Sequence, residues 1–155
     1  EPADLERELA TYEAAYREAF PRRVLGVLGL KPAGADDAVE LMKALFGWMG
    51  QTHATWPQVF FDWFGGEASA ERAKLSPLAG LYASSDFEDV RGLLMAHAPE
   101  RPERLAHPYF RGELPASLLI EEVEALWDRI ADADDWAPFY AHMDRIETAR
   151  QALSL

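Results

Sequence analysis

The sequence predicts an all-α fold, a single compact multi-helix domain of roughly six to eight helices. Apolar residues recur at helical spacing in several long segments, and no segment alternates apolar and polar residues as a half-buried strand does. No internal repeat divides the chain. Its 155 residues, 49% of them hydrophobic, are enough for one domain with its own core and hardly for two.

The first third of the chain contains two predicted helices. The first covers residues 4–20, with Asp4 as its N-cap, and Pro21 is expected to kink or end it. Its apolar face consists of Leu5, Leu9, Tyr12, Tyr16 and Phe20. Asp36 is expected to cap the second helix and Gly50 to close it. The inward side chains of the second helix are Leu41, Met42, Leu45, Phe46 and Met49.

The segment "TWPQVFFDWFGG", residues 55–66, carries five aromatic side chains within nine positions. Thr55 is a suitable N-cap, Pro57 is tolerated in the first turn, and the two glycines end the helix. More than half of the helix circumference is apolar, so we expect a central helix between two packed layers. An exposed docking face is the alternative, and a membrane wedge is disfavoured by the charge of the chain.

Two specific expectations follow for this aromatic helix. Phe60 and Trp63 should be largely buried, because they cluster on the apolar side of the helical wheel. Asp62 falls in the remaining sector, together with Gln58, and should be exposed.

Residues 67–116 are predicted to form only short helices. One or two brief helices surround Pro77, and Asp86 caps the next one. The stretch "PERPERLAHPYFRGELP" at 99–115 contains four prolines and should be mostly irregular.

Residues 117–131 show the clearest amphipathic pattern of the chain. A stripe about 120° wide should face inward. It contains Leu119, Ile120, Val123, Leu126, Trp127 and Ile130. Asp134 or Asp135 should cap a last helix, whose apolar side contains Trp136, Phe139, Tyr140, Met143, Ile146 and Leu153. Because the "DADD" connection is short, these two helices should pack antiparallel, with Trp127 and Ile130 against residues such as Trp136 and Phe139.

Charge and composition exclude several classes of partner. The formal net charge is −12, from 27 acidic and 15 basic residues, which disfavours nucleic acid and anionic membrane surfaces. No apolar run approaches the roughly 20 residues that cross a bilayer, and no signal-peptide pattern is present. There are no cysteines, so disulfides and thiolate metal sites are excluded. These features lead us to expect a cytoplasmic protein.

No residue pattern in the chain predicts a catalytic, cofactor-binding or metal site. The four histidines, His53, His97, His107 and His142, match no helical zinc motif, and no glycine segment matches a phosphate-binding loop. Glu121, Glu124 and Asp128 should form a solvated face rather than the inward row that binds metals in helical bundles. The loop residues His107, Tyr109, Arg111 and Glu113 could carry chemistry, but contacts that tie the loop to the helices explain them more simply.

Three landmarks of the chain resemble the C-terminal region of a known protein family. They are a "VLGL" turn at 27–30, the acidic-capped helix "DDAVELMKALFGWM" at 36–49, and the aromatic helix "TWPQVFFDWF" at 55–64. The later stretches "SPLAGLYASSDF", "HPYFRGELPASLLIEEVEALW" and "DDWAPFYAHMDRI" are similar to one proteobacterial branch of that family. Over nearly its whole length, the chain therefore resembles the selenoprotein O-like, or YdiU-type, protein adenylyltransferases.

The resemblance implies that residues 1–155 are the helical C-terminal part of a longer pseudokinase-like protein. In that family a kinase-like core binds ATP and magnesium and transfers AMP to hydroxyl side chains of other proteins. The catalytic lysine, the acidic metal ligands and the glycine-rich loop precede this region, so the resemblance assigns no catalytic, cofactor or metal residue here. It implies an accessory role, with the catalytic core as partner.

The chain also departs from the family pattern. It ends "ARQALSL", without the selenocysteine or cysteine of some members, and it lacks the proline-asparagine motif and arginine-rich helix of the usual family ending. Two alternatives therefore stand beside the accessory role. One is a free-standing helical interaction module, and the other is a small enzyme using the loop around His107 and Arg111. A severed domain should also expose an apolar patch, through which it could form a homo-oligomer.

Overall fold

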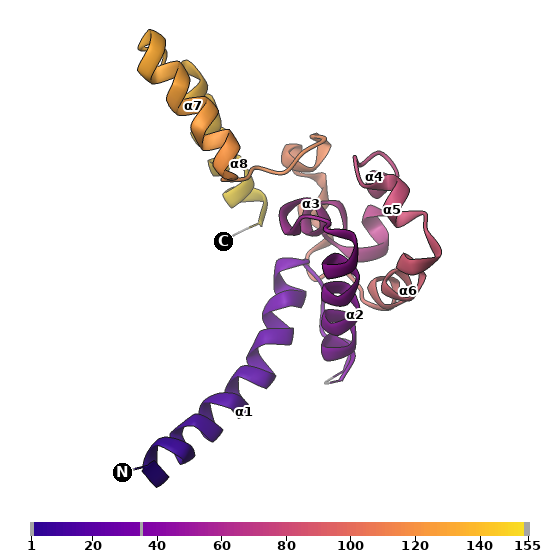
Figure 1. The fold of residues 1–155 in the computed structure, drawn as a ribbon. Coiled ribbons are helices and arrows are strands. Elements are labelled where there is room, and N and C mark those ends of the chain that lie inside the picture. Colours follow the sequence, from indigo (N-terminus) through magenta and orange to yellow (C-terminus); the bar gives the residue numbers. More distant parts are fainter. Residues whose placement is uncertain (1, 35, 154–155) are drawn as a thin grey trace.

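The computed structural model describes residues 2–34 and 36–153, and these residues contain eight α-helices and four short 3₁₀ helices (Figure 1). The α-helices are α1 (Pro2–Val27), α2 (Asp37–Thr52), α3 (Trp56–Asp62), α4 (Ala70–Ala73), α5 (Ala79–Tyr82), α6 (Glu88–Ala96), α7 (Ile120–Ala133) and α8 (Ala137–Leu153). The 3₁₀ helices are η1 (Gly66–Ser69), η2 (Ser85–Phe87), η3 (Pro102–Ala106) and η4 (Pro108–Arg111). The all-α prediction is confirmed. No described helix is long and apolar enough to cross a membrane.

The main core forms where the last turns of α1 meet α2, α3 and α6. Its most deeply buried side chains are 1% exposed or less, and they include Leu25, Leu28, Leu41, Leu45, Val59, Phe87 and Leu94. Each apolar side chain of this size stabilises the fold by about 1.5–3 kcal/mol when it is fully buried. The predicted inward face of α2 is confirmed, and Trp48 joins it as a further buried ring.

We expected Pro21 to kink or end the first helix, and the structure shows that α1 does not end there. It continues through the proline to Val27. A proline removes one hydrogen bond to the carbonyl four residues earlier. That carbonyl belongs to Arg17, which is exposed, so water can satisfy it. The turns after Pro21 are held by Val24 and Leu25, which are buried in the main core.

Three of the predicted helix ends also differ from the structure. Gly50 lies inside α2, which continues to Thr52 and ends at His53 in the left-handed conformation, with φ of 56°. Asp86 does not cap α6, because it lies within the preceding η2 turn. Asp4 likewise lies inside α1 rather than before it.

Helix α3 is central, as predicted. Val59 and Trp63 belong to the main core, whereas Phe61 and Phe64 join Phe110 and Ala152 in a second core cluster. The helix therefore lies between two packed groups of side chains. Gly65 and Gly66 follow it with φ of 86° and 63°. A Cβ on Gly66 would lie 2.8 Å from the carbonyl oxygen of Leu94, so this turn requires glycine.

Helices α7 and α8 lie side by side and project beyond the rest of the chain as a hairpin (Figure 1). Asp134 turns the chain with φ of 51°, and the Asp135 carboxylate accepts a hydrogen bond from the amide of Ala137 at the start of α8. Asp135 also pairs with Arg129 at 2.6 Å. The predicted antiparallel packing of the last two helices is confirmed, whereas Trp127 is largely exposed.

Candidate interaction surface

Asp62 is buried, with 1% of its surface exposed, so the prediction of an exposed side chain was wrong. Its carboxylate accepts hydrogen bonds from Gln58 Nε2 at 2.9 Å, from Ser76 Oγ and from Tyr82 Oη at 2.8 Å. Gln58 is buried as well. The polar sector of α3 faces residues 76–82 rather than solvent, and these residues supply the donors that make burial of a carboxylate tolerable.

Burial raises the pKa of Asp62 above its ordinary value of 3.8. The hydrogen bonds from its three donors and the charge of Arg72 act in the opposite direction. Burial and the neighbouring Asp62 also raise the pKa of Tyr82. These hydrogen-bonding side chains include neither a histidine nor a cysteine, and the carboxylate is inaccessible. The cluster is therefore a structural cross-link between α3 and residues 76–82.

Arg72 binds the backbone at the same, C-terminal, end of the helix. Its Nη2 atom donates to the carbonyl oxygens of Phe61 at 2.7 Å and Phe64 at 3.2 Å, where a helix C-terminus leaves carbonyl groups in need of donors. The guanidinium lies 5.0 Å from the ring centroid of Phe61 and 4.7 Å from that of Phe110. Burial lowers the pKa of Arg72 to about 10, against the opposing influence of Asp62. The C-terminal end of the aromatic helix is thus fixed by the Asp62 cluster and by Arg72.

A cavity of about 290 Å³ lies beside this cluster. It is lined by Trp63, Ala70, Ala73, Lys74, Ala79, Tyr82, Ala83 and Arg91. Both of its cations are engaged within the chain. Lys74 pairs with Glu71 at 2.6 Å, and Arg91 donates to the carbonyl oxygen of Tyr82.

Three of the four loop residues that could have carried chemistry make contacts that tie the loop into the fold. His107 Nδ1 accepts a hydrogen bond from the amide of Tyr109 at 3.2 Å, and the Tyr109 hydroxyl accepts one from the amide of Ala116 at 3.3 Å. The carbonyl oxygen of Glu113 accepts one from Gln58 at 3.4 Å. Arg111 is exposed.

The other predicted polar residues are dispersed over the chain. His53 is exposed, His97 is buried with Nδ1 3.0 Å from the carbonyl oxygen of Lys31, and His142 is buried on α8. Within the described residues, no group of three or more His, Cys, Asp or Glu side chains could hold a metal ion. The acidic side chains of Glu121, Glu124 and Asp128 are exposed, and so are the lysines Lys31, Lys43 and Lys74.

The exposed apolar side chains are concentrated on two projecting elements, the first part of α1 and the α7–α8 hairpin. Of the sixteen large apolar residues that are exposed in the described chain, twelve lie on α1 or between residues 118 and 143. On α1 they are Leu5, Leu9, Tyr12 and Tyr16. The predicted apolar faces of these helices therefore exist, but much of them faces solvent rather than the core.

On the hairpin, only two of the six residues of the predicted 119–130 stripe are covered. Leu126 and Ile130 are partly buried, whereas Ile120 and Trp127 are 70% and 62% exposed. The predicted inward stripe is thus wrong for four of its six residues, because one neighbouring helix cannot cover 120° of apolar surface. Tyr140 and Met143 on α8 are exposed, as is Trp136 just before this helix. The buried side chains of α8 are instead His142, Ala149 and Ala152.

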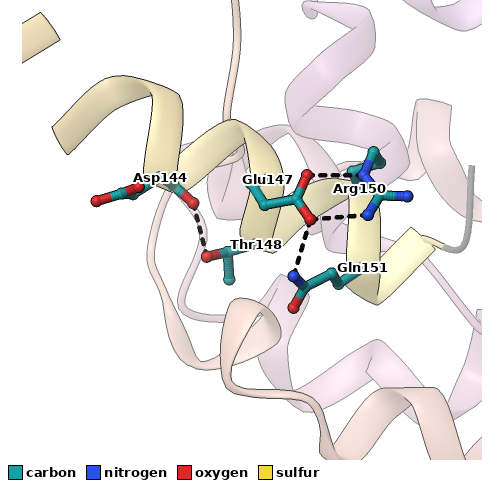
Figure 2. Close-up of polar contacts among 5 residues, drawn as sticks. All are labelled: Asp144, Glu147, Thr148, Arg150 and Gln151. Atoms are coloured by element: carbon teal, nitrogen blue, oxygen red, sulfur yellow. Dashed lines mark hydrogen bonds and ion pairs between the residues drawn. The ribbon is translucent and has the colours of Figure 1, made fainter. Parts of the chain in front are cut away.

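A polar cluster follows the exposed apolar residues along α8, and Figure 2 shows its hydrogen bonds and ion pairs. Glu147 lies one helical turn after Met143, and its carboxylate pairs with Arg150 through two contacts of 2.7 Å and with Gln151 at 2.9 Å. These contacts lower the pKa of Glu147 to about 2. On α8 the exposed apolar residues therefore lie before this cluster, whereas on α7 they extend back to Ile120 at the start of the helix.

A continuous row of aromatic rings connects the other exposed face to the body of the protein. Successive ring centroids lie 4.4–6.0 Å apart from α1 through α2 to α3. This aromatic ladder consists of Tyr12, Tyr16, Phe20, Phe46, Trp56 and Phe60. Trp56 is 52% exposed and Phe60 only partly buried, so the prediction of a largely buried residue holds for Trp63 and only in part for Phe60.

Two hollows flank Phe20 in this ladder. An apolar cleft of about 280 Å³ between α1 and α3 is lined by Phe20, Arg23, Val24, Val27, Trp56, Pro57 and Phe60. A second hollow of about 410 Å³ between α1 and α2 is lined by Tyr16, Arg17, Phe20, Pro21, Val39, Met42 and Lys43.

The chain is similar to a known protein, the protein nucleotidyltransferase YdiU of Gloeobacter violaceus. The two are 29% identical over 158 residues, which cover 93% of this chain and 31% of that protein. The chain therefore spans about a third of the length of its relative. No protein-family model matches the chain, and no solved structure matches it. The similarity supports the expected relation to the YdiU-type proteins.

Proposed function

We propose that the chain is an accessory helical part of a protein nucleotidyltransferase. The observation that carries this proposal is the similarity of 93% of the chain to 31% of YdiU. A match of this form fits a chain that corresponds to one part of a longer enzyme. The finer expectations are part of the same proposal: the C-terminal position, a proteobacterial source, transfer of AMP from ATP with magnesium, and a cytoplasmic location.

The hairpin is the surface that we assign to the remaining part of the enzyme. Ile120 and Trp127 expose most of their surface to solvent, and Tyr140 is 62% exposed on the neighbouring helix. Large apolar side chains gathered on one element mark an interaction surface. Packing against the rest of the protein would remove this surface from water.

The chemistry of nucleotidyl transfer is proposed to lie outside these 155 residues. Stabilising the transferred group requires cations and oriented donors at the phosphates. The three lysines of the chain are exposed and do not share a pocket among the cavities described above. The contribution of this part would be to support and orient the catalytic part.

The size of the native polypeptide tests the proposal directly. An antiserum raised against the 155 residues should detect, in extracts of the source cells, a protein of roughly three times 17.4 kDa, because the chain spans 31% of its relative. A sole band at the mass of the isolated chain would overturn the proposal and favour the free-standing interaction module.

Variants of the longer protein test the role of the hairpin. Ile120→Glu and Trp127→Glu should lower the activity or stability of the longer protein while leaving the melting temperature of the isolated chain unchanged. Leu75→Glu is the matched control, because Leu75 is 84% exposed and lies outside both projecting elements. If all three substitutions change the activity and stability of the longer protein equally, the hairpin is not part of the interface.

A further inference from the structure

We propose that the exposed face of α1 binds α1 of a second copy of the chain, in antiparallel orientation. The proposal goes beyond the proposed function, which assigns only the hairpin to a partner. It concerns the α1 stripe, defined as Leu5, Leu9, Tyr12 and Tyr16.

The spacing of the α1 stripe indicates that its partner is another helix. Its residues follow one another at intervals of four, three and four positions, which is the pattern of a coiled-coil seam. The four side chains are between 49% and 72% exposed. A helical segment without tertiary contacts is marginally stable in water, so a partner that covers the stripe would also stabilise the helix.

The charges along α1 favour an antiparallel copy of the same helix. Residues 2–13 contain four acidic residues and one arginine, a net charge of −3. Residues 14–27 contain three arginines and one glutamate, a net charge of +2. An antiparallel pair places the acidic half of each helix beside the basic half of the other, whereas a parallel pair places like charges together.

The structure also offers a place for the end of the partner helix. With the two-fold axis near Tyr12, Leu5 of one copy falls opposite the region of Phe20 in the other. Phe20 lies between the apolar cleft against α3 and the larger hollow against α2, and Arg23 lines the cleft. An apolar side chain from an acidic helix end therefore meets apolar walls and a cation there. Such a contact is isologous, since each copy supplies the same surface.

Sedimentation velocity of the isolated chain tests the pairing. We expect a dimer at tens of micromolar, and Leu9→Glu should weaken its association by at least about tenfold, because the charge would enter an apolar seam. Leu75→Glu should leave association unchanged. A chain that stays monomeric throughout this range, or a dimer that Leu9→Glu does not weaken, would overturn the proposal.

Disulfide cross-links between introduced cysteines can determine the relative orientation of the two α1 helices, because the chain contains no cysteine of its own. Under mild oxidation, Tyr12→Cys alone should form a disulfide-linked dimer. Leu5→Cys should not link to itself but should link to Phe20→Cys in a mixture of the two variants. Self-linkage of Leu5→Cys would show a parallel pair and contradict the antiparallel arrangement.

The longer protein provides the decisive comparison. If it dimerises through the same Tyr12→Cys cross-link, the pairing is a property of the native protein. If the cross-link forms in the isolated chain but not in the longer protein, the stripe belongs to an intramolecular interface and the proposal fails. The mass measured with the antiserum is unaffected by either result, so the proposed function is judged separately.

Discussion

A buried carboxyl group links the folding of this protein to pH. Because burial raises the pKa of Asp62 in the folded state, the folded chain binds that proton more tightly than the unfolded chain does. The contribution of Asp62 to the free energy of unfolding is therefore greatest below pH 3.8 and is lost as pH rises through the raised pKa.

The comparison of wild type with Asp62→Asn isolates this contribution. Urea denaturation between pH 3 and pH 7 should show that the wild type loses stability relative to the variant as pH rises. The pKa of Glu147 is lowered, so its contribution to stability has the opposite pH dependence. This contribution is the same in wild type and variant and cancels in the comparison. A difference that is constant with pH would show that Asp62 has the same pKa folded and unfolded.

The two phenylalanines Phe87 and Phe60 should differ greatly in their contribution to the free energy of unfolding. Phe87 is fully buried between Trp48, Trp63 and Tyr82, so Phe87→Ala should cost about 3–5 kcal/mol. Phe60→Ala should lower the free energy of unfolding by less, because Phe60 is only partly buried. Chemical denaturation followed by circular dichroism measures both changes, and equal losses would contradict the burial described above.

Helices α2 and α7 have similarly clear apolar faces in the sequence but different surroundings in the structure. In the isolated chain, Trp127→Gln on α7 should change the free energy of unfolding by no more than about 0.5 kcal/mol, since the side chain is exposed. Leu45→Ala on α2 should cost about 2–5 kcal/mol. The same denaturation measurement compares them, and a large loss for Trp127→Gln would place that side chain in a core.

The whole chain should not bind a nucleotide by itself. Its net charge of −12 repels polyphosphates, and its three lysines are exposed. Calorimetric titration with millimolar ATP, with magnesium or manganese, should give no saturable heat. Saturable binding, or transfer of label from α-labelled ATP to a protein acceptor, would place chemistry within these residues.

Periodicity in the sequence predicted the existence of the long helices and the central position of α3 but not what covers each face. The stripe of α7 and the face of α1 look like core faces in the sequence, because the pattern shows that a surface is apolar and not whether this chain covers it. Asp62 was misplaced for a related reason. Its donors Ser76 and Tyr82 lie 14 and 20 residues away, and only tertiary structure brings them together. No local signal could have found this cluster.

The exposed first turns of α1 have a consequence for how proteases attack the chain. Residues 7–19 are all exposed, so this segment opens without disturbing the main core. At concentrations too low for association, trypsin should cut first after Arg7 and Arg17 and leave a resistant fragment that begins at Glu18. Arg72, held against the end of α3, should be cut only after global unfolding. The order in which these peptides appear in mass spectra would map the boundary between the part that unfolds locally and the part that unfolds as a unit.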